Sequence, residues 1–360
     1  RESIEKLIEK YLLHNAHSTI VIVKPEEGLT AKKDALVAEE LAKYKASLSQ
    51  EQLEQLVKDT KALKAYQEEP STQEELESIP MLTREDMKKE VRPLISQERE
   101  AEGQKIIFQD VYTNGIAYIK FVFDISELTK LAPYLSLLTT ALGYMNTEAH
   151  TYLEFSNETN IYTGGLLADT NTYSQVGKKD AYKLTFELRT KVLYENIKKA
   201  MSLLKEMVFT TDFSDDKRLL EIIVEAKSRL QMKLNGSGHS VALTRSMSYF
   251  SELAKLNDEM EGIAYYNFLC DLEKNFAKKS KQVKEIFKQI LLYAVNKENM
   301  LMSVTADEDG YKAFVEAMPE FLSAVEEKRT QSKPEADISM LAHGKQEGFK
   351  YAGQVQYVAR

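Results

Sequence analysis

The sequence of 360 residues predicts an α+β fold, with an antiparallel sheet and helices packed on one of its faces. Three observations lead to this prediction. Alternating or β-branched apolar runs typical of strands cover residues 106–112, 116–123, 182–189 and 300–305. Apolar residues at helical spacing fill most of the chain between these runs. The composition, with 43% apolar and 29% charged residues, is that of a folded globular protein.

The charge balance and the cysteine count exclude several classes of protein. Lys and Arg number 48 against 56 Asp and Glu, so the net charge of −8 favours solubility and offers no basic surface for nucleic acid. The single cysteine, Cys270, cannot form an internal disulfide framework. No run approaches 18 apolar residues, so no transmembrane helix is predicted. The first residues show no signal-peptide pattern.

Both ends of the chain carry elements that cannot bury themselves alone. A short helix is expected over residues 3–13, followed by a buried strand over residues 18–23 that stops at Pro25. Residues 354–358 alternate like a further strand. We therefore expect both strands to belong to sheets completed elsewhere, and we interpret the chain as part of a longer protein.

The next stretch predicts an αα-hairpin that precedes the α+β unit. Apolar residues form helical stripes over residues 36–48 and 53–66, with charged outer faces that we interpret as solvated. Ser49 stands at the N-cap of the second helix, and Gln52 three residues later completes a capping box. Prolines punctuate residues 70–95, which we interpret as a linker.

The α+β unit begins near Gly103. Asn114 and Gly115 separate its first two predicted strands, and this pair is the strongest short signal for a β-hairpin, because both turn positions need positive φ. Helices are expected over residues 128–142, 151–162, 196–208, 214–234, from 241 onward, 282–295 and 311–325. Ser214 is the predicted N-cap of the fourth helix. Polar residues 328–337 predict a second linker.

The residues themselves predict no metal site. The five histidines are His14, His17, His150, His239 and His343. His14 and His17 are the only close pair, with no carboxylate nearby, and we interpret them as polar residues of a turn. His150 and Glu154 are four residues apart on one helix face, but no third ligand is near in sequence. His239 is expected to donate to a backbone carbonyl at a helix break. No HExxH or HxxEH motif is present.

Nucleophilic and nucleotide-binding chemistry is not predicted either. Cys270 lies in an apolar helical setting and is expected to be a small core residue. The glycine-rich pieces at residues 164–165 and 236–238 match neither a P-loop nor a dinucleotide fingerprint. We interpret the first as a helix C-cap with its turn and the second as a helix break. The residues therefore predict no catalytic, cofactor-binding or metal-binding side chain.

Several short motifs point to a family. They are residues 161–165 (IYTGG), 226–230 (AKSRL), 236–240 (GSGHS) with Arg245, and 261–269 (EGIAYYNFL). With these motifs in this order, the chain resembles the presequence-protease subfamily of the pitrilysin/insulinase zinc metallopeptidases. Residues 24–25 (KP) and 79–82 (IPML) flank the helical hairpin as in the linker between that family's two halves.

The resemblance implies a clamshell of four homologous α+β domains, two on each side of the hairpin. In such enzymes the first domain binds zinc through an HxxEH motif and a distant Glu, and the motif Glu acts as general base on a zinc-bound water. The halves close around an unfolded peptide, part of which pairs with a sheet edge.

On this resemblance the chain is the middle of such an enzyme. Residues 1–25 correspond to the end of the second domain, and residues 26–95 to the hairpin linker. Residues 100–345 correspond to the third, non-catalytic domain, and residues 346–360 to the lead into the fourth. The resemblance thus implies no cofactor in this segment and a zinc ion in the parent's first domain.

The resemblance carries no catalytic residue onto this chain. The helix over residues 131–142 is the counterpart of the zinc helix, which puts the motif positions near Pro133, Ser136 and Leu137. None of these three is a metal ligand. No catalytic, cofactor-binding or metal-binding residue is therefore predicted.

The leading hypothesis is a non-catalytic segment of a zinc-dependent metalloendopeptidase that degrades unfolded peptides. The segment would form the hinge and a chamber wall, with the parent's other domains and the peptide substrate as partners, and without nucleic acid or membrane. The alternative is a standalone scaffold or interaction protein with a degenerate peptidase fold, which the unfinished strands at both ends argue against. A third reading is an enzyme with its own unrecognised site. The lack of disulfide-forming cysteines favours a bacterial cytoplasm or an organelle matrix.

Overall fold

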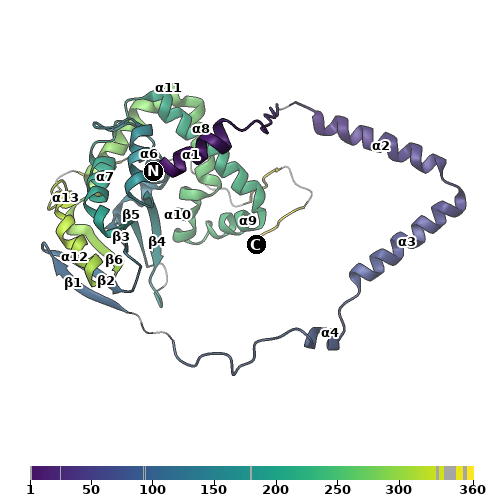
Figure 1. The fold of residues 1–360 in the computed structure, drawn as a ribbon, viewed down its shortest axis with the longest axis horizontal. Helices are drawn as coiled ribbons and strands as arrows, with labels where there is room; N and C mark the ends of the chain where they lie inside the picture. The colour runs from purple at the N-terminus through teal and green to yellow at the C-terminus, as the bar shows by residue number, and fades with distance from the viewer. Residues whose placement is uncertain are drawn as a thin grey trace. The chain divides into compact units, whose positions relative to one another are not determined.

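The computed structural model describes residues 2–24, 26–91, 93, 95–178, 181–329, 332–335, 346–351 and 355–360. Three residues singled out above, Pro25, His343 and Gln354, lie outside this set. The chain divides into two compact units, Arg1–Val91 and Arg92–Arg360, and each is described by itself (Figure 1).

The first unit is helical. Its elements are α1 (Glu2–Ile8), the π-helix η1 (Glu9–Leu13), α2 (Leu29–Ser47), α3 (Gln50–Glu68) and α4 (Gln73–Glu77). The predicted capping box is confirmed: the Ser49 hydroxyl accepts from the Gln52 N–H at 3.2 Å, and the Gln52 side chain accepts from the Ser49 N–H at 2.8 Å. A second box, between Thr72 and Glu75, starts α4 inside the stretch predicted to be a linker.

The apolar seam predicted between the two long helices is not formed. Leu36, Leu41, Tyr44, Leu56 and Leu63 are each more than half exposed. Capping and helix propensity act within a few residues and suffice to form α2 and α3. Pairing them requires burial of apolar area, and a narrow stripe offers little of it. The helix prediction is therefore confirmed, and the packing prediction is wrong for this chain.

The two terminal strand predictions are also wrong for the described residues. Residues 18–23 belong to no strand, and Ile20 and Val23 are almost 90% exposed. Residues 355–358 likewise lie outside the sheet. A β-strand exists only when its N–H and C=O groups pair with a neighbour. None of the strands in the described part of the chain pairs with either segment.

The second unit holds a six-stranded sheet in the spatial order β1-β2-β6-β3-β5-β4. Its strands are β1 (Ser96–Ala101), β2 (Gln104–Asp110), β3 (Ile116–Asp124), β4 (Leu166–Ser174), β5 (Tyr182–Leu193) and β6 (Met300–Ala306). All neighbours are antiparallel except β2 and β6, which are parallel. The predicted α+β class is confirmed, with one parallel pair added to an otherwise antiparallel sheet.

The hairpin predicted across Asn114 and Gly115 is not formed. Both residues have the expected positive φ, 53° and 79°. However, β6 lies between β2 and β3, so the two strands are not neighbours. Positive φ reverses the chain, but it does not decide which strand pairs with which. The hairpin of this region instead joins β1 to β2 through Glu102 and Gly103, which also have positive φ.

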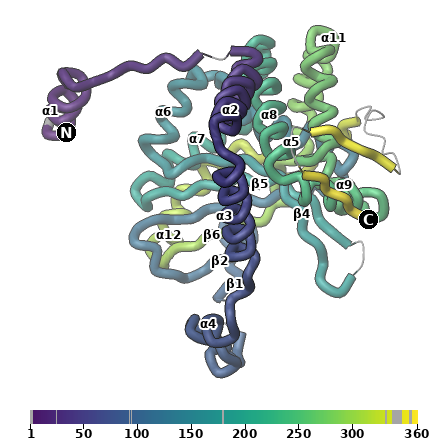
Figure 2. Tube along the Cα trace, turned by 90° about the vertical axis from the view of Figure 1, so that its right-hand side faces the viewer, coloured from purple at the N-terminus to yellow at the C-terminus, as the bar shows by residue number. Residues whose placement is uncertain are grey.

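Helices cover one face of the sheet, as predicted (Figures 1 and 2). They are η2 (Ser126–Leu131), α5 (Ala132–Ala141), α6 (Tyr152–Tyr162), η3 (Tyr194–Asn196), α7 (Ile197–Phe209), α8 (Asp216–Gly236), α9 (Gly238–Met247), α10 (Glu252–Glu261), α11 (Ile263–Ala294), η4 (Lys297–Asn299), α12 (Glu308–Ala317) and α13 (Pro319–Leu322). The sheet's inner face packs on them: Phe121 of β3 lies 4.6 Å from Phe321 and 6.3 Å from Phe314, between ring centroids.

Several helix boundaries differ from the predictions. Asp215, not Ser214, caps α8 by accepting from the Arg218 N–H at 3.0 Å, because Ser214 is bound to Asp212. The helix predicted over residues 282–295 is the second half of α11. The last predicted helix is split in two by Pro319, which starts α13. Pro334, in the second predicted linker, is buried.

Candidate functional site

The sheet's outer face, opposite the main helical layer, is the first candidate surface. The strand register places Ile107, Ser303, Lys120, Arg189 and Leu167 in one row across five strands. We define the outer face as this row and the residues that alternate with it on the same side. Among the described residues, the aromatic contacts between helices and sheet run through the inner face. The outer face combines charged, hydroxyl and apolar side chains, which suits contact with a varied partner.

A buried carboxylate anchors the polar groups of the outer face. Glu187 is fully buried, accepts from the Tyr173 hydroxyl at 2.6 Å and from Thr185 Oγ1 at 3.1 Å, and pairs with Lys120 Nζ at 3.1 Å. Burial alone would raise the pKa of Glu187, but Tyr173 and Lys120 outweigh it and hold the pKa below its ordinary value. Burial and the bond to Glu187 raise the pKa of Tyr173 to about 12. Glu187 is therefore a fixed ion that orders the surface, not a proton carrier at neutral pH.

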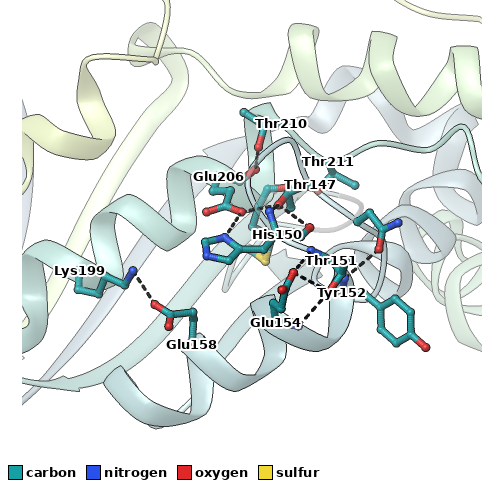
Figure 3. A network of polar contacts seen from close by, with 12 residues as sticks. Thr147, His150, Thr151, Tyr152, Glu154, Glu158, Lys199, Glu206, Thr210 and Thr211 are labelled. Carbon is teal, nitrogen blue, oxygen red and sulfur yellow. Dashed lines mark hydrogen bonds and ion pairs between the residues drawn. The ribbon is translucent and has the colours of Figure 1, made fainter.

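His150 does not form the metal pair considered with Glu154. Figure 3 shows its ring turned toward Glu206 of α7, with Nδ1 at 2.7 Å from Oε1. Glu154 instead accepts from the Thr151 N–H at 2.9 Å and caps α6. Thr147 donates to Glu206 as well. This network joins the loop before α6 to the end of α7 and is structural.

The other sequence-selected residues have structural positions too. His14 lies 3.6 Å from a carboxylate oxygen of Glu9, which corrects the expectation that no carboxylate is near. Both side chains are mostly exposed, so this pair stabilises little. Cys270 is half-buried and not a core residue, because its side of α11 meets the surface. Within the described residues, no group of three or more His, Cys, Asp or Glu is placed to hold a metal ion.

Two of the motifs meet at a groove, the second candidate surface. The groove is a cavity of about 940 Å³ between α8, α9, α11 and residues 346–351 and 355–359. Arg245 of α9 lies at its base with a side chain only 7% exposed, and it binds Asp258 of α10 at 2.5 Å. Asp258 also accepts from the Ile263 N–H at 2.9 Å. A Cβ at Gly262 would lie 2.3 Å from that carboxylate, which explains the glycine.

His239, in the first of these motifs, corrects another expectation. Among the described residues its ring finds no carbonyl acceptor. It is exposed, and its centroid lies 5.9 Å from that of Tyr357. The helix break at residues 236–238 therefore serves the groove, because it presents the start of α9 to the segment that carries Tyr357. The motif letters alone give no sign of this role, since Tyr357 is more than 100 residues away.

The comparison with protein families decides the assignment. The family of peptidase-associated domains described for subfamily C of the M16 peptidases matches residues 23–272. The chain belongs to this peptidase-associated family. Protein HypA of Clostridium perfringens is 33% identical to the chain over 357 residues, 99% of this chain and 36% of that protein. Presequence protease 1, chloroplastic/mitochondrial, of Arabidopsis thaliana is 26% identical over 322 residues, 89% of this chain and 30% of that protein.

Among solved structures, an M16 peptidase inactive domain from Pseudomonas fluorescens aligns with a TM-score of 0.42 and 14% identity, over 67% of this chain and 53% of that one. The peptidase-associated chain spans about a third of the length of the two curated relatives. Its counterparts of the zinc-motif positions, Pro133, Ser136 and Leu137, are buried in α5. None of the helices in its described parts is both long and apolar enough to span a bilayer.

Proposed function

We propose that this peptidase-associated chain is a non-catalytic part of a zinc-dependent metalloendopeptidase that degrades unfolded peptides, and that its outer face forms a wall of the peptide chamber. The observation that carries the proposal is the row of charged, hydroxyl and apolar side chains across the outer face, opposite the helices that bury the inner face. Membership of the peptidase-associated family and relatives named presequence proteases support it.

The proposed organisation follows the family resemblance. Residues 1–25 end a second domain, residues 26–95 link two halves, residues 100–345 form the third domain, and residues 346–360 lead into a fourth. The zinc ion belongs to the first domain of the parent. The partners are the parent's other domains and the unfolded peptide, in a bacterial cytoplasm or an organelle matrix.

The linker role predicts where proteases cut first. Protease treatment should nick residues 66–95 before the core at residues 100–330, because residues 66–91 contain no buried residue while the core is closely packed. Mass spectrometry of the early fragments locates the cuts. Cleavage spread evenly along the chain would contradict the linker assignment.

The chamber-wall role is tested in the full-length protein with two matched substitutions. Leu167, on the outer face, and Leu292, on α11, are both 56% exposed. Leu167→Glu should raise KM for an unfolded peptide by roughly 3- to 10-fold, the effect of about 1 kcal/mol of lost contact, and leave kcat unchanged. Leu292→Glu should change neither constant. Equal effects of the two substitutions would sink the chamber-wall proposal.

The alternative scaffold function has its own outcome in the same experiment. A full-length gene product without an HxxEH motif, and without hydrolysis of unfolded peptides in the presence of zinc, would replace the peptidase proposal by the scaffold. Zinc content by elemental analysis and the reading frame around this segment complete the comparison.

A further inference from the structure

The segment that follows the α+β unit is held in the groove by a charged fork. Arg245 Nε binds Glu347 Oε2 at 2.6 Å, and a second guanidinium nitrogen binds Oε1 at 2.9 Å. The Tyr249 hydroxyl donates to the same carboxylate. Parallel bonds between a guanidinium and a carboxylate are the strongest and most directional polar contact that two side chains make. Residue 347 is thus seated on a receptor, not merely near a surface cation.

The receptor half of this contact is built by the helices alone. Asp258 holds the other edge of the guanidinium and is itself fixed by the start of α11. The side chains of Arg245 and Asp258 are 7% and 1% exposed. Although burial lowers the pKa of Arg245, its two carboxylate partners raise it above the ordinary value, so the cation is permanent. The remaining edge of Arg245 therefore faces residues 346–351 in an orientation set beforehand, which reduces the entropy lost on docking.

A second anchor lies at the other end of the segment. The Tyr357 ring packs on Gly238, where a Cβ would lie 2.6 Å from two ring atoms. The Tyr351 hydroxyl donates to the Val355 carbonyl at 2.5 Å, and the rings of Tyr351 and Tyr357 lie 6.1 Å apart. The two ends of the segment therefore support each other across the groove. Figure 1 shows the end of the chain beside α9.

We propose that the groove between α8, α9 and α11 is a docking site for the chain's own residues 346–351 and 355–358, with the Glu347 carboxylate and the Tyr357 ring as its two anchors. The site recognises an acidic residue followed by aromatic ones: Arg245 is the carboxylate receptor, and Gly238 leaves room for the ring. Docking fixes the chain's exit on the helical layer. Whatever follows Arg360 in a longer protein then starts from α9. The charge match between Arg245 and Glu347 and the seated segment itself identify the occupant.

Hydrogen exchange of the full chain, read by mass spectrometry, tests both anchors separately. Glu347→Gln removes the charge from the fork and should speed exchange of the amides at residues 346–351 by about tenfold or more, the usual effect of losing bonds to a buried charge. Arg245→Lys keeps the charge but loses the fork and should give the same direction of change. Glu335→Gln, at an exposed position twelve residues earlier, should change nothing.

Gly238→Ala tests the second anchor without altering any charge. Alanine suits the first turn of α9 and displaces only the Tyr357 ring, so exchange should speed up at residues 355–358 while α9 keeps its protection. Exchange in the sheet peptides reports that every variant is folded.

Three outcomes would overturn the proposal. The first is equally fast exchange of residues 346–351 and 355–358 in the wild type and in all variants. The second is protection that survives both Glu347→Gln and Gly238→Ala. The third is protection that rises with protein concentration, which would mean that a second copy supplies the segment.

Discussion

Glu259→Gln is expected to stabilise the 92–360 unit above pH 7 and to remove much of its pH dependence. Glu259 lies on α10 and is only 6% exposed. Burial raises its pKa to about 7; Lys255 opposes the rise, whereas Asp258 and Glu252 add to it. Tyr182 of β5 also faces this carboxylate, which contributes to the raised pKa of the tyrosine.

The sign follows from proton linkage. The folded state holds the Glu259 proton up to about pH 7, whereas the unfolded chain loses it near the ordinary value of 4.5. Between these values the folded state binds more protons, so stability is lost as the pH rises from about 4.5 to about 7. The loss amounts to about 3 kcal/mol, at roughly 1.4 kcal/mol for each tenfold change in proton affinity. Glutamine cannot ionise and escapes this loss.

Urea unfolding at pH 4.5 and pH 8 measures the effect. The wild type and Glu259→Gln should differ little at pH 4.5, and the variant should be the more stable by up to about 3 kcal/mol at pH 8. Glu261→Gln on the same helix is the control, because its carboxylate is 63% exposed and pairs only with surface Lys233. Parallel pH profiles for the wild type and Glu259→Gln would disprove the assignment of the titration to this residue.

Phe121→Ala should lower the free energy of unfolding of the same unit by about 3–5 kcal/mol, the usual cost of truncating a buried aromatic side chain. The Phe121 ring is fully buried on the inner face and touches the rings of Phe314 and Phe321. The substitution leaves a cavity between the sheet and the helices α12 and α13, because the surrounding backbone can close it only in part.

The matched control is Tyr118→Ala, three residues earlier on the same strand. Tyr118 points to the outer face and is 47% exposed, so its truncation should cost less than about 1.5 kcal/mol. Thermal or urea unfolding of both variants decides the matter. Similar losses for both would mean that the outer face is packed as tightly as the inner one, which would also weaken the chamber-wall proposal.

Local features of this fold were predictable because their causes lie within a few residues. The Ser49–Gln52 capping box and the positive φ of Asn114 and Gly115 follow from side-chain reach and backbone sterics at those positions. Strand pairing was not predictable in this way. The edge strands β1 and β4 are polar and lack clear apolar alternation, so neither was foreseen.

The candidate sites show the same division. The motifs around Arg245 and Gly262 were recognised only as signs of a family, because neither contains a known catalytic pattern. Their partners explain them: Asp258 and Glu347 lie 13 and 102 residues from Arg245 along the chain. A buried cation requires carboxylates beside it, but its position in the sequence does not say which ones.

Composition, periodicity and short motifs were enough to determine the α+β class, most helices and the peptidase-related family of this protein. Only the tertiary structure decided that β6 enters the sheet between β2 and β3, that the apolar stripes of α2 and α3 stay exposed, and that residues 346–351 and 355–358 lie over Arg245. Helices and turns depend on contacts between near neighbours in sequence, whereas each of these three outcomes depends on which distant apolar and charged groups exclude water together.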